Sequence, residues 1–562
     1  MRRAAGLCCA LLLVCTSGAP ARPGPPLLYA KVHLSALVAP THAFPAAPLL
    51  VSGTDGYRRG EYLYQDYLYD DHGADTTPGL GASAGWASQP LFAPAAGDAA
   101  YPAGDRYRDN AADLVELRIR PQRHAIAYRA TLNTAIAADA AVIGIGIDTD
   151  RSGGPAVAWP LGAGVSSPGL DAFITAWGTG GSITRFATGT TTPLPAGAVR
   201  MDLVTNQMTI RVPRGVLDPG TKTWRYVAGT GLWDGRGWMA PGVFNLAFRF
   251  AEPVGSIPGT GAGLPGYTTA PGTGSWFEDG QARDLAAGTT GAEHADVDFG
   301  ALARHVTRDV HAPGRVQARI LSSSLKLAEG IDHTTFPEFG GALQPYLVTL
   351  PADYSPTRPA PVLFALHPSN SGYQPFDVFM PHWAAQLGAK RIVVTLLDRG
   401  LNGPDGVSGQ FTGAAEANFF EAFADLRRHF ALDRSRILLS GYSLGAYADY
   451  HLAELWPDLF ASVFSVVGTS PTNGRDTELL ANLRCVPLLA WNQADDALVP
   501  YTDVSATAAK LDALGIRHEQ WTFPAGNHLA PALRDDWAGA AQQIGDPVVE
   551  RDPPRVDYGY YP

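Results

Sequence analysis

The feature that most constrains the fold is an alternation of short apolar runs and helical segments in the C-terminal part of the chain. The predicted strands cover 345–350, 361–366, 391–397, 436–440, 459–467, 486–491 and 518–523. Helical patterns occupy 376–387, 415–430, 446–455, 505–514 and 532–544. Strands that alternate with helices form βαβ units, whose strands run parallel. The pattern therefore predicts a doubly wound, mostly parallel sheet over residues 345–545.

Residues 28–320 have a different texture, with many glycines, prolines and threonines and few helical patterns. Strand-like runs are found at 113–120, 125–132, 141–147, 199–204, 208–212, 223–227 and 245–250. Polar and apolar residues alternate in the first two, which indicates strands with one buried face. No self-similar repeat of propeller-blade length is visible. We therefore expect a multidomain chain: an all-β sandwich over 28–320, a linker over 321–344, the α/β domain, and a Pro/Tyr-rich tail over 546–562.

The first 21 residues have the pattern of a secretory signal peptide. Arg2 and Arg3 precede an apolar run from Ala4 to Cys15, and small residues suited to cleavage end at Ala21. The apolar run is too short to cross a bilayer, and no other stretch predicts a membrane span. We expect an exported protein, extracellular or periplasmic. Lipoprotein anchoring at Cys15 has weaker support, because Val14 precedes it where a small residue is expected.

Charge and cysteine content exclude several classes of protein. The net charge is −11, and no cluster of Lys or Arg follows the first few residues, so the chain lacks the basic surface of a nucleic-acid-binding protein. Three of the four cysteines lie in the signal peptide, which leaves Cys485 alone and permits no intrachain disulfide in the mature chain. Nothing in the sequence calls for a cofactor.

The segment Gly441-Tyr-Ser-Leu-Gly445 has the G-x-S-x-G pattern of a nucleophile elbow. This motif requires a strand before the serine and a helix after it. Both are predicted around Ser443. A second match, Gly81–Gly85 around Ser83, lies in a Gly/Ala-rich stretch with no strand before it. We therefore predict Ser443 as a nucleophile and Ser83 as a loop residue.

A serine nucleophile needs a base and an acid, which follow it in chain order in this type of fold. His528 follows the predicted strand 518–523, in the loop Pro524–His528 where the base is expected. The acid should follow the strand 486–491, where Asp495 and Asp496 are adjacent. Counting forward from the strand favours Asp495, and counting back from Pro500 favours Asp496. Asp495 is the preferred candidate, with Asp496 as the alternative.

An oxyanion hole requires two N–H donors near the serine. Leu444, at the start of the helix after Ser443, should supply one. The second should come from the loop after the strand 361–366. Pro368 has no N–H, so Ser369 is the predicted donor, and His367 is interpreted as structural.

With these residues placed, the C-terminal part resembles the prolyl-oligopeptidase-like and feruloyl-esterase-like branch of the α/β-hydrolases. The resemblance is based on Tyr346–Pro351, Leu366-His367, Gly441–Gly445, Trp456–Phe460, the Asp495 segment and Gly526–His528. The sequence His367-Pro-Ser-Asn departs from the family, which has more glycine there. The resemblance implies an α/β-hydrolase that cleaves an ester or related acyl bond, on a small molecule or on a polymer, through an acyl-enzyme.

Two other functions remain open at this stage. A serine peptidase of the prolyl-oligopeptidase type, acting as an exo- or oligopeptidase, would use the same chemistry. The missing propeller repeats count against the oligopeptidase mode of action but not against exopeptidase action. A polysaccharide-binding or adhesion protein with a degenerate hydrolase domain is the third hypothesis. The complete set of Ser443, His528 and an acid argues against it.

Short motifs in the N-terminal part resemble the DOMON-like β-sandwich at the C-terminus of glucodextranases. They are Tyr67–Asp75, Tyr101-Pro102 and Asn110–Leu114. The resemblance implies a domain that binds carbohydrate or another surface. Oxygen ligands for calcium could come from nearby aspartates, although their spacing forms no complete calcium loop and turn formation is the preferred interpretation. These aspartates are Asp66, Asp70, Asp71, Asp75, Asp148 and Asp150.

Overall fold

The computed structural model describes most of the chain from residue 22 onward. The described residues are 22–559, with gaps at 32–33, 75–98, 179, 251–254, 260–273, 279, 327–328, 330–340, 370–372, 374–379, 381, 400–409, 471–476 and 558. The predicted signal peptide, Ser83 and Asp75 lie outside them. No described helix is long and apolar enough to cross a membrane.

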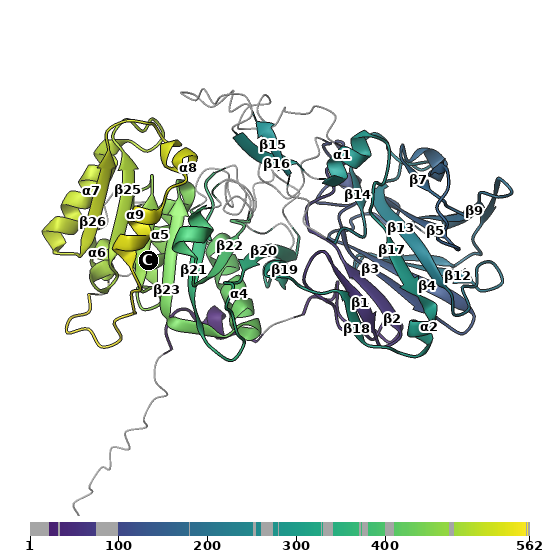
Figure 1. Ribbon diagram of the computed structural model, residues 1–562, viewed down its shortest axis with the longest axis horizontal. Helices are drawn as coiled ribbons and strands as arrows, with labels where there is room; N and C mark the ends of the chain where they lie inside the picture. The colour runs from purple at the N-terminus through teal and green to yellow at the C-terminus, as the bar shows by residue number, and fades with distance from the viewer. Residues whose placement is uncertain are drawn as a thin grey trace, which may run out of the picture.

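The C-terminal part is built on a mixed sheet in the order β19-β20-β22-β21-β23-β24-β25-β26 (Figure 1). β20 runs antiparallel to both of its neighbours, and the strands from β22 to β26 pair in parallel. The bounds are β19 Val316–Ser322, β20 Leu343–Thr349, β21 Ala360–Leu366, β22 Ile392–Leu396, β23 Leu432–Tyr442, β24 Ser462–Val466, β25 Leu488–Gln493 and β26 His518–Phe523. The prediction of a mostly parallel sheet is confirmed.

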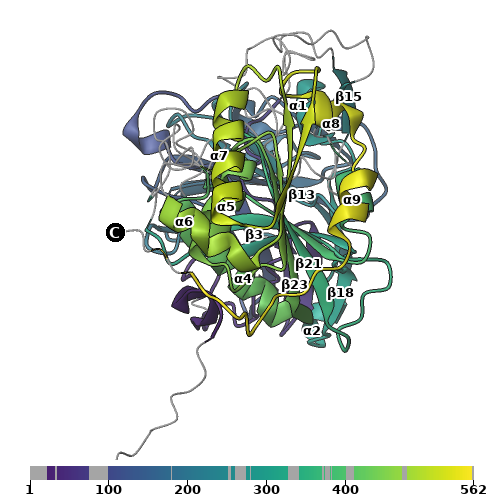
Figure 2. The same cartoon turned by 90° about the vertical axis from the view of Figure 1, so that its left-hand side faces the viewer.

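Helices cover both faces of this sheet, as Figure 2 shows for α4 to α7 on one side and α9 on the other. The first group is α4 Ala414–His429, α5 Leu444–Leu455, α6 Thr477–Ala481 and α7 Tyr501–Leu514. The other face carries the π-helical turn Trp383–Leu387, α8 Ala530–Arg534 and α9 Ala538–Ile544. Successive strand residues point to opposite faces, so Phe364 packs in the cluster with α4 while Leu363 packs in the cluster with Trp383.

The N-terminal part contains two antiparallel sheets of seven strands each among the described residues. One has the order β11-β12-β4-β3-β2-β1-β18. Its bounds are β1 Thr54–Arg58, β2 Glu61–Gln65, β3 Leu114–Pro121, β4 Ala125–Leu132, β11 Val199–Asp202, β12 Gln207–Pro213 and β18 Arg308–His311. The other has the order β10-β9-β8-β5-β13-β14, with β17 on β13. Its bounds are β5 Ala141–Asp148, β8 Ala172–Trp177, β9 Gly180–Arg185, β10 Thr190–Pro193, β13 Thr223–Leu232, β14 Phe244–Leu246 and β17 Ala295–Asp298.

The two sheets share one hydrophobic cluster. Ile119 and Tyr128 of the first sheet and Ile145 and Tyr226 of the second belong to it. The Tyr128 and Tyr226 hydroxyls lie 3.3 Å apart. The remaining elements are two short ladders, β6 Ala156–Ala158 with β7 Ser166–Pro168 and β15 Gly255–Gly259 with β16 Gly274–Glu278, and the helices α1 Gly280–Ala286 and α2 Phe299–Ala303.

The structure corrects the predicted boundary between the two parts. β19 begins at Val316, inside the range assigned to the sandwich, yet it pairs antiparallel with β20 and belongs to the C-terminal sheet. The 3₁₀ turn Pro26–Tyr29 also lies with that sheet, since Leu28 packs in its core and accepts a hydrogen bond from Arg427. The sequence could not show either contact, because the partners are remote along the chain.

The two parts contact each other through the edge strand β19. The backbone N–H of Ser52 donates to Ala318 O at 2.8 Å, and that of Ile320 donates to Leu50 O at 3.1 Å. Next to this edge, the hydroxyl of Tyr69 accepts a hydrogen bond from Gln344 Nε2 at 2.7 Å. These bonds cover part of an otherwise unpaired sheet edge.

Candidate active site

Ser443 lies at a sharp turn between β23 and α5. Its backbone has φ +54° and ψ −114°, a conformation that is strained for a residue with a side chain. The flanking glycines are required by close packing. A Cβ at Gly441 would lie 2.2 Å from the carbonyl of Gly445, and a Cβ at Gly445 would lie 2.1 Å from the carbonyl oxygen of Leu366. The structure therefore places Ser443 on the strand-to-helix turn that the sequence predicts.

Parallel strands bring the other candidate residues to the same edge of the sheet. Asp496 follows β25, and His528 follows β26, the neighbour of β25. Because β23, β25 and β26 are parallel, their carboxyl ends meet at one edge, which is where ligands bind in open α/β sheets.

The three side chains form a continuous hydrogen-bonded chain. His528 Nε2 lies 2.8 Å from Ser443 Oγ, and His528 Nδ1 lies 2.7 Å from Asp496 Oδ2. Both His528 and Asp496 are buried, while Ser443 is partly exposed. The carboxylate fixes the imidazole tautomer that carries a proton on Nδ1 and leaves Nε2 free to accept the serine proton.

The structure places Asp496, not the preferred candidate Asp495, against the imidazole. Asp496 Oδ1 accepts the N–H groups of Leu498 and Val499 at 2.8 and 2.9 Å, which orients its other oxygen toward His528. The preference for Asp495 was wrong because counting from a strand end does not show which of two adjacent side chains turns inward.

Asp495 holds the loop that carries His528. Its carboxylate accepts the N–H groups of Gly526 and Asn527 at 3.1 and 3.0 Å, and these bonds lower the pKa of Asp495. Asp495 is exposed to solvent and is a positioning residue. Its hydrogen bonds hold the backbone of the loop, whereas the imidazole bonds to Asp496.

Two further residues hold His528, and the sequence interpretation missed both. The Tyr442 hydroxyl donates to the carbonyl oxygen of His528 at 2.5 Å. Asn527 adopts φ +57°, and its side-chain oxygen accepts the N–H of His528 at 2.6 Å. Each is adjacent in sequence to a predicted triad residue, and an asparagine before the histidine is a signal for a left-handed turn.

The predicted oxyanion donors lie on neighbouring strands. Leu366, the last residue of β21, pairs with Gly441 of β23, so the loop containing Ser369 starts beside the turn at Ser443. Leu444 is the first residue of α5. Their donor roles remain predictions.

His367 shapes the loop after β21, and its two hydrogen bonds go to backbone groups outside the triad. Its Nδ1 donates to Pro368 O at 2.8 Å, and its Nε2 accepts the N–H of Asp398 at 3.0 Å. Burial lowers the pKa of His367 to about 4, so the ring is neutral at physiological pH. These contacts agree with the structural role that the sequence interpretation gave it.

Asp449 is fully buried on the face of α5 that packs behind the nucleophile turn. Burial raises the pKa of Asp449 well above its usual value, partly offset by the N–H of Gly441. The folded protein therefore holds this proton more tightly than the unfolded chain. Stability is lost as the pH rises from the ordinary aspartate pKa of about 4 toward the raised value, and is not regained above it.

We predict that Asp449→Asn raises the thermal unfolding temperature at pH 8 and changes it little at pH 4. At pH 8 the unfolded chain carries Asp449 as a charged carboxylate, which must take up a proton or lose its hydration when the chain folds. The neutral amide of asparagine avoids this cost. In a domain of this size, the unfolding temperature rises by about 2–4 °C per kcal/mol of added stability. Thermal unfolding at both pH values measures this. Asp512→Asn, at an exposed position, is the control. Equal melting temperatures of wild type and Asp449→Asn at pH 8 would contradict the prediction.

The aspartates considered for calcium have other partners. Asp70 forms a buried ion pair with Arg249, and Asp71 accepts from the Tyr101 hydroxyl. Asp66 accepts hydrogen bonds from the Tyr64 hydroxyl and from the N–H of Tyr67. Asp148 accepts from the N–H groups of Asp150 and Arg151. Asp150 accepts from the N–H of Ser152. Among the described residues, no three His, Cys, Asp or Glu side chains are grouped to hold a metal ion. The hydrogen bonds of Asp148 and Asp150 to the N–H groups that follow them form a turn, as the preferred interpretation expects. Calcium binding by these aspartates stays an untested interpretation.

No protein-family model matches the chain. Several solved hydrolase structures are similar to it. The fluorophosphonate-binding serine hydrolase F of Staphylococcus aureus is 15% identical over 42% of this chain and 98% of its own, with a TM-score of 0.32. A ferulic acid esterase of Anaeromyces mucronatus is 15% identical over 41% of this chain and 91% of its own, with a TM-score of 0.31. A thermostable esterase is 10% identical over 78% of this chain and 96% of its own, with a TM-score of 0.32.

Proposed function

We propose that this chain is a serine hydrolase that cleaves a carboxylic ester or a related acyl bond. The observation that supports the proposal is the chain of two short hydrogen bonds from Ser443 through His528 to Asp496. A serine at a strained turn, next to a buried imidazole that a carboxylate orients, is the arrangement that activates a hydroxyl for attack.

The reaction proceeds in two halves. Ser443 Oγ attacks the carbonyl carbon while His528 Nε2 takes its proton, and the N–H groups of Leu444 and Ser369 bind the negative oxygen of the tetrahedral intermediate. His528 then donates the proton to the leaving alcohol as the carbon–oxygen bond breaks. A water molecule, deprotonated by His528, cleaves the acyl-enzyme and restores Ser443. Asp496 stabilises the imidazolium in both halves.

The scissile bond is tested by comparing p-nitrophenyl acyl esters with Pro- and Ala-p-nitroanilides on the purified mature chain. We expect kcat/KM for short-chain esters to exceed that for the anilides. Faster cleavage of the anilides would favour the prolyl-oligopeptidase-type peptidase instead. No turnover of either class, together with no fluorophosphonate labelling, would favour the non-catalytic adhesion protein.

We also propose that the protein is exported, extracellular or periplasmic, and that its N-terminal part is a DOMON-like β-sandwich that binds polysaccharide. Two antiparallel sheets with a shared core support the sandwich. Cell fractionation tests the export. Retention of the full chain on insoluble glycans tests the binding, and the absence of retention on every glycan would contradict it.

A further inference from the structure

A cavity of about 440 Å³ lies at the edge of the sheet opposite Ser443. Ala360 and Pro361, at the start of β21, line it, whereas the last residue of that strand, Leu366, is the neighbour of Gly441. Six residues of extended chain span about 20 Å, so this cavity is separate from the catalytic edge. Its volume is in the range of small-molecule sites.

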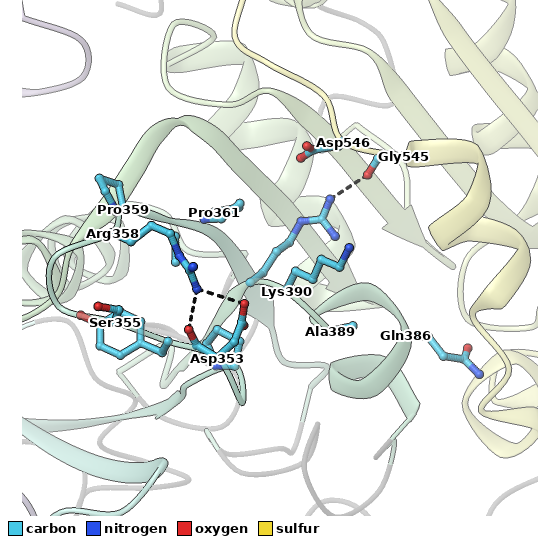
Figure 3. Close-up of a pocket in the computed structure, with 14 residues that line it drawn as sticks. Asp353, Ser355, Arg358, Pro359, Pro361, Gln386, Ala389, Lys390, Gly545 and Asp546 are labelled. Atoms are coloured by element: carbon cyan, nitrogen blue, oxygen red, sulfur yellow. Dashed lines mark hydrogen bonds and ion pairs between the residues drawn. The ribbon is translucent and has the colours of Figure 1, made fainter.

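Three cationic and two anionic side chains line the cavity. Figure 3 labels four of them: Asp353, Arg358, Lys390 and Asp546. The cations are Arg358, Lys390 and Arg391. Of the carboxylates, Asp353 is paired with Arg358 at 3.1 Å. Asp546 is paired at 3.6 Å with Arg436, which does not line the cavity.

Of the three cavity cations, Lys390 and Arg391 form no ion pair with any residue that the structure describes. Arg391 donates instead to two neutral carbonyl oxygens, Leu387 O at 2.6 Å and Gly545 O at 2.8 Å. It is half-buried, and burial lowers the pKa of its guanidinium despite the nearby Asp546. Asp546 is itself paired with Arg436, and Arg391 forms no ion pair of its own with a described residue. An anion in the cavity would therefore offset the cost of partly desolvating this cation.

The rest of the lining is suited to an apolar group. Pro351, Pro359 and Pro361 contribute ring surfaces, and Tyr354 contributes a half-buried phenol ring beside them. The site thus combines two cations that form no ion pair with a described residue and an apolar wall, a combination that favours a ligand with one charged end and a hydrophobic body.

We propose that this cavity binds a small organic carboxylate, with its charged group between Lys390 and Arg391 and its apolar body against Tyr354 and the prolines. The proposal does not depend on the chemistry at Ser443. A carboxylate would gain charge-assisted hydrogen bonds from both cations, and Arg391 has N–H groups beyond the two that bind carbonyls.

Isothermal titration of the full mature chain with benzoate, at constant ionic strength, tests this site. Benzyl alcohol serves as the neutral analogue and inorganic phosphate as an anion without an apolar body. We expect benzoate to bind more tightly than either. Lys390→Gln should weaken benzoate binding about tenfold, as expected for the loss of one charge-assisted contact.

Two further variants make the result decisive. Arg391→Lys keeps the positive charge and should weaken benzoate less than Arg391→Gln does. Lys222→Gln removes an exposed lysine in the N-terminal part and should leave binding unchanged. Benzoate binding that is absent, that is matched by benzyl alcohol or exceeded by phosphate, or that is insensitive to Lys390→Gln would overturn the proposal. Benzoate that binds only near Ser443 would also be insensitive to Lys390→Gln, and this result too would overturn the proposal.

Discussion

Ser443→Ala is expected to lower kcat for the best ester substrate by about 10⁶-fold and to abolish labelling by a fluorophosphonate probe. Ser443 Oγ is the atom that forms the covalent bond to the acyl carbon of the substrate, and alanine has no nucleophilic atom in its place. The backbone N–H donors are unchanged, so a residual rate above the uncatalysed one should remain. Gel-based labelling and steady-state kinetics measure the two effects.

The second G-x-S-x-G match provides the matched control for this variant. Ser83→Ala should label and turn over like wild type, since the sequence gives Ser83 no strand–turn–helix context. The melting temperature of Ser443→Ala should stay close to that of wild type, because the side chain is small and partly exposed. Labelling that persists in Ser443→Ala, or is lost in Ser83→Ala, would mean that another serine is the nucleophile.

Asp496→Asn is expected to lower kcat by about 10⁴-fold with little change in KM. An amide at this position can donate to His528 Nδ1 and so favour the tautomer in which Nε2 carries the proton, which cannot accept one from Ser443. The loss also removes the charge that stabilises the imidazolium. Kinetics on a p-nitrophenyl ester, extrapolated to saturating substrate, measure the effect.

Asp495→Asn, one residue earlier, is the comparison that distinguishes the two carboxylates. The N–H groups of Gly526 and Asn527 bind different oxygens of the Asp495 carboxylate, and the single amide oxygen of asparagine can keep only one of these bonds. We expect a loss of less than about tenfold, from a less firmly held loop. A larger loss in Asp495→Asn than in Asp496→Asn would show that the acid assignment from the geometry is wrong.

Periodic segments were predicted well from the sequence because local patterns specify them. The stripe of phenylalanines predicts a helix over 415–430, and α4 spans Ala414–His429. The strand predicted at 518–523 coincides with β26. The helix predicted over 532–544 is instead two short helices, because Asp535 adopts φ +44° and ends α8. The carboxylate of Asp535 accepts hydrogen bonds from the N–H of His382 and from the Trp537 indole N–H. The contact with His382 joins segments far apart in the sequence, so no local pattern predicts it.

Elements whose pairing is non-local were the ones that the sequence did not reveal. β1 and β2 lie within the N-terminal part without a predicted strand, and β19 was divided between the sandwich and the linker. β19 belongs to the C-terminal sheet only because Val316 to Ser322 pair with Thr349 to Leu343 across a long connection. Strand pairing of this kind depends on which edges meet in space.

The sequence by itself determined the nucleophile turn, since two glycines around Ser443 are the only residues that fit where α5 approaches β23 and β21. It also determined that the base follows β26 and the acid follows β25. Only the tertiary structure decided that Asp496 faces the imidazole and that Asp495 holds the neighbouring loop. It also decided that Lys390 and Arg391 line one cavity with Tyr354 at the far edge of the sheet. The direction of a loop side chain and the meeting of distant segments depend on contacts with the rest of the fold, which no local pattern of residues encodes.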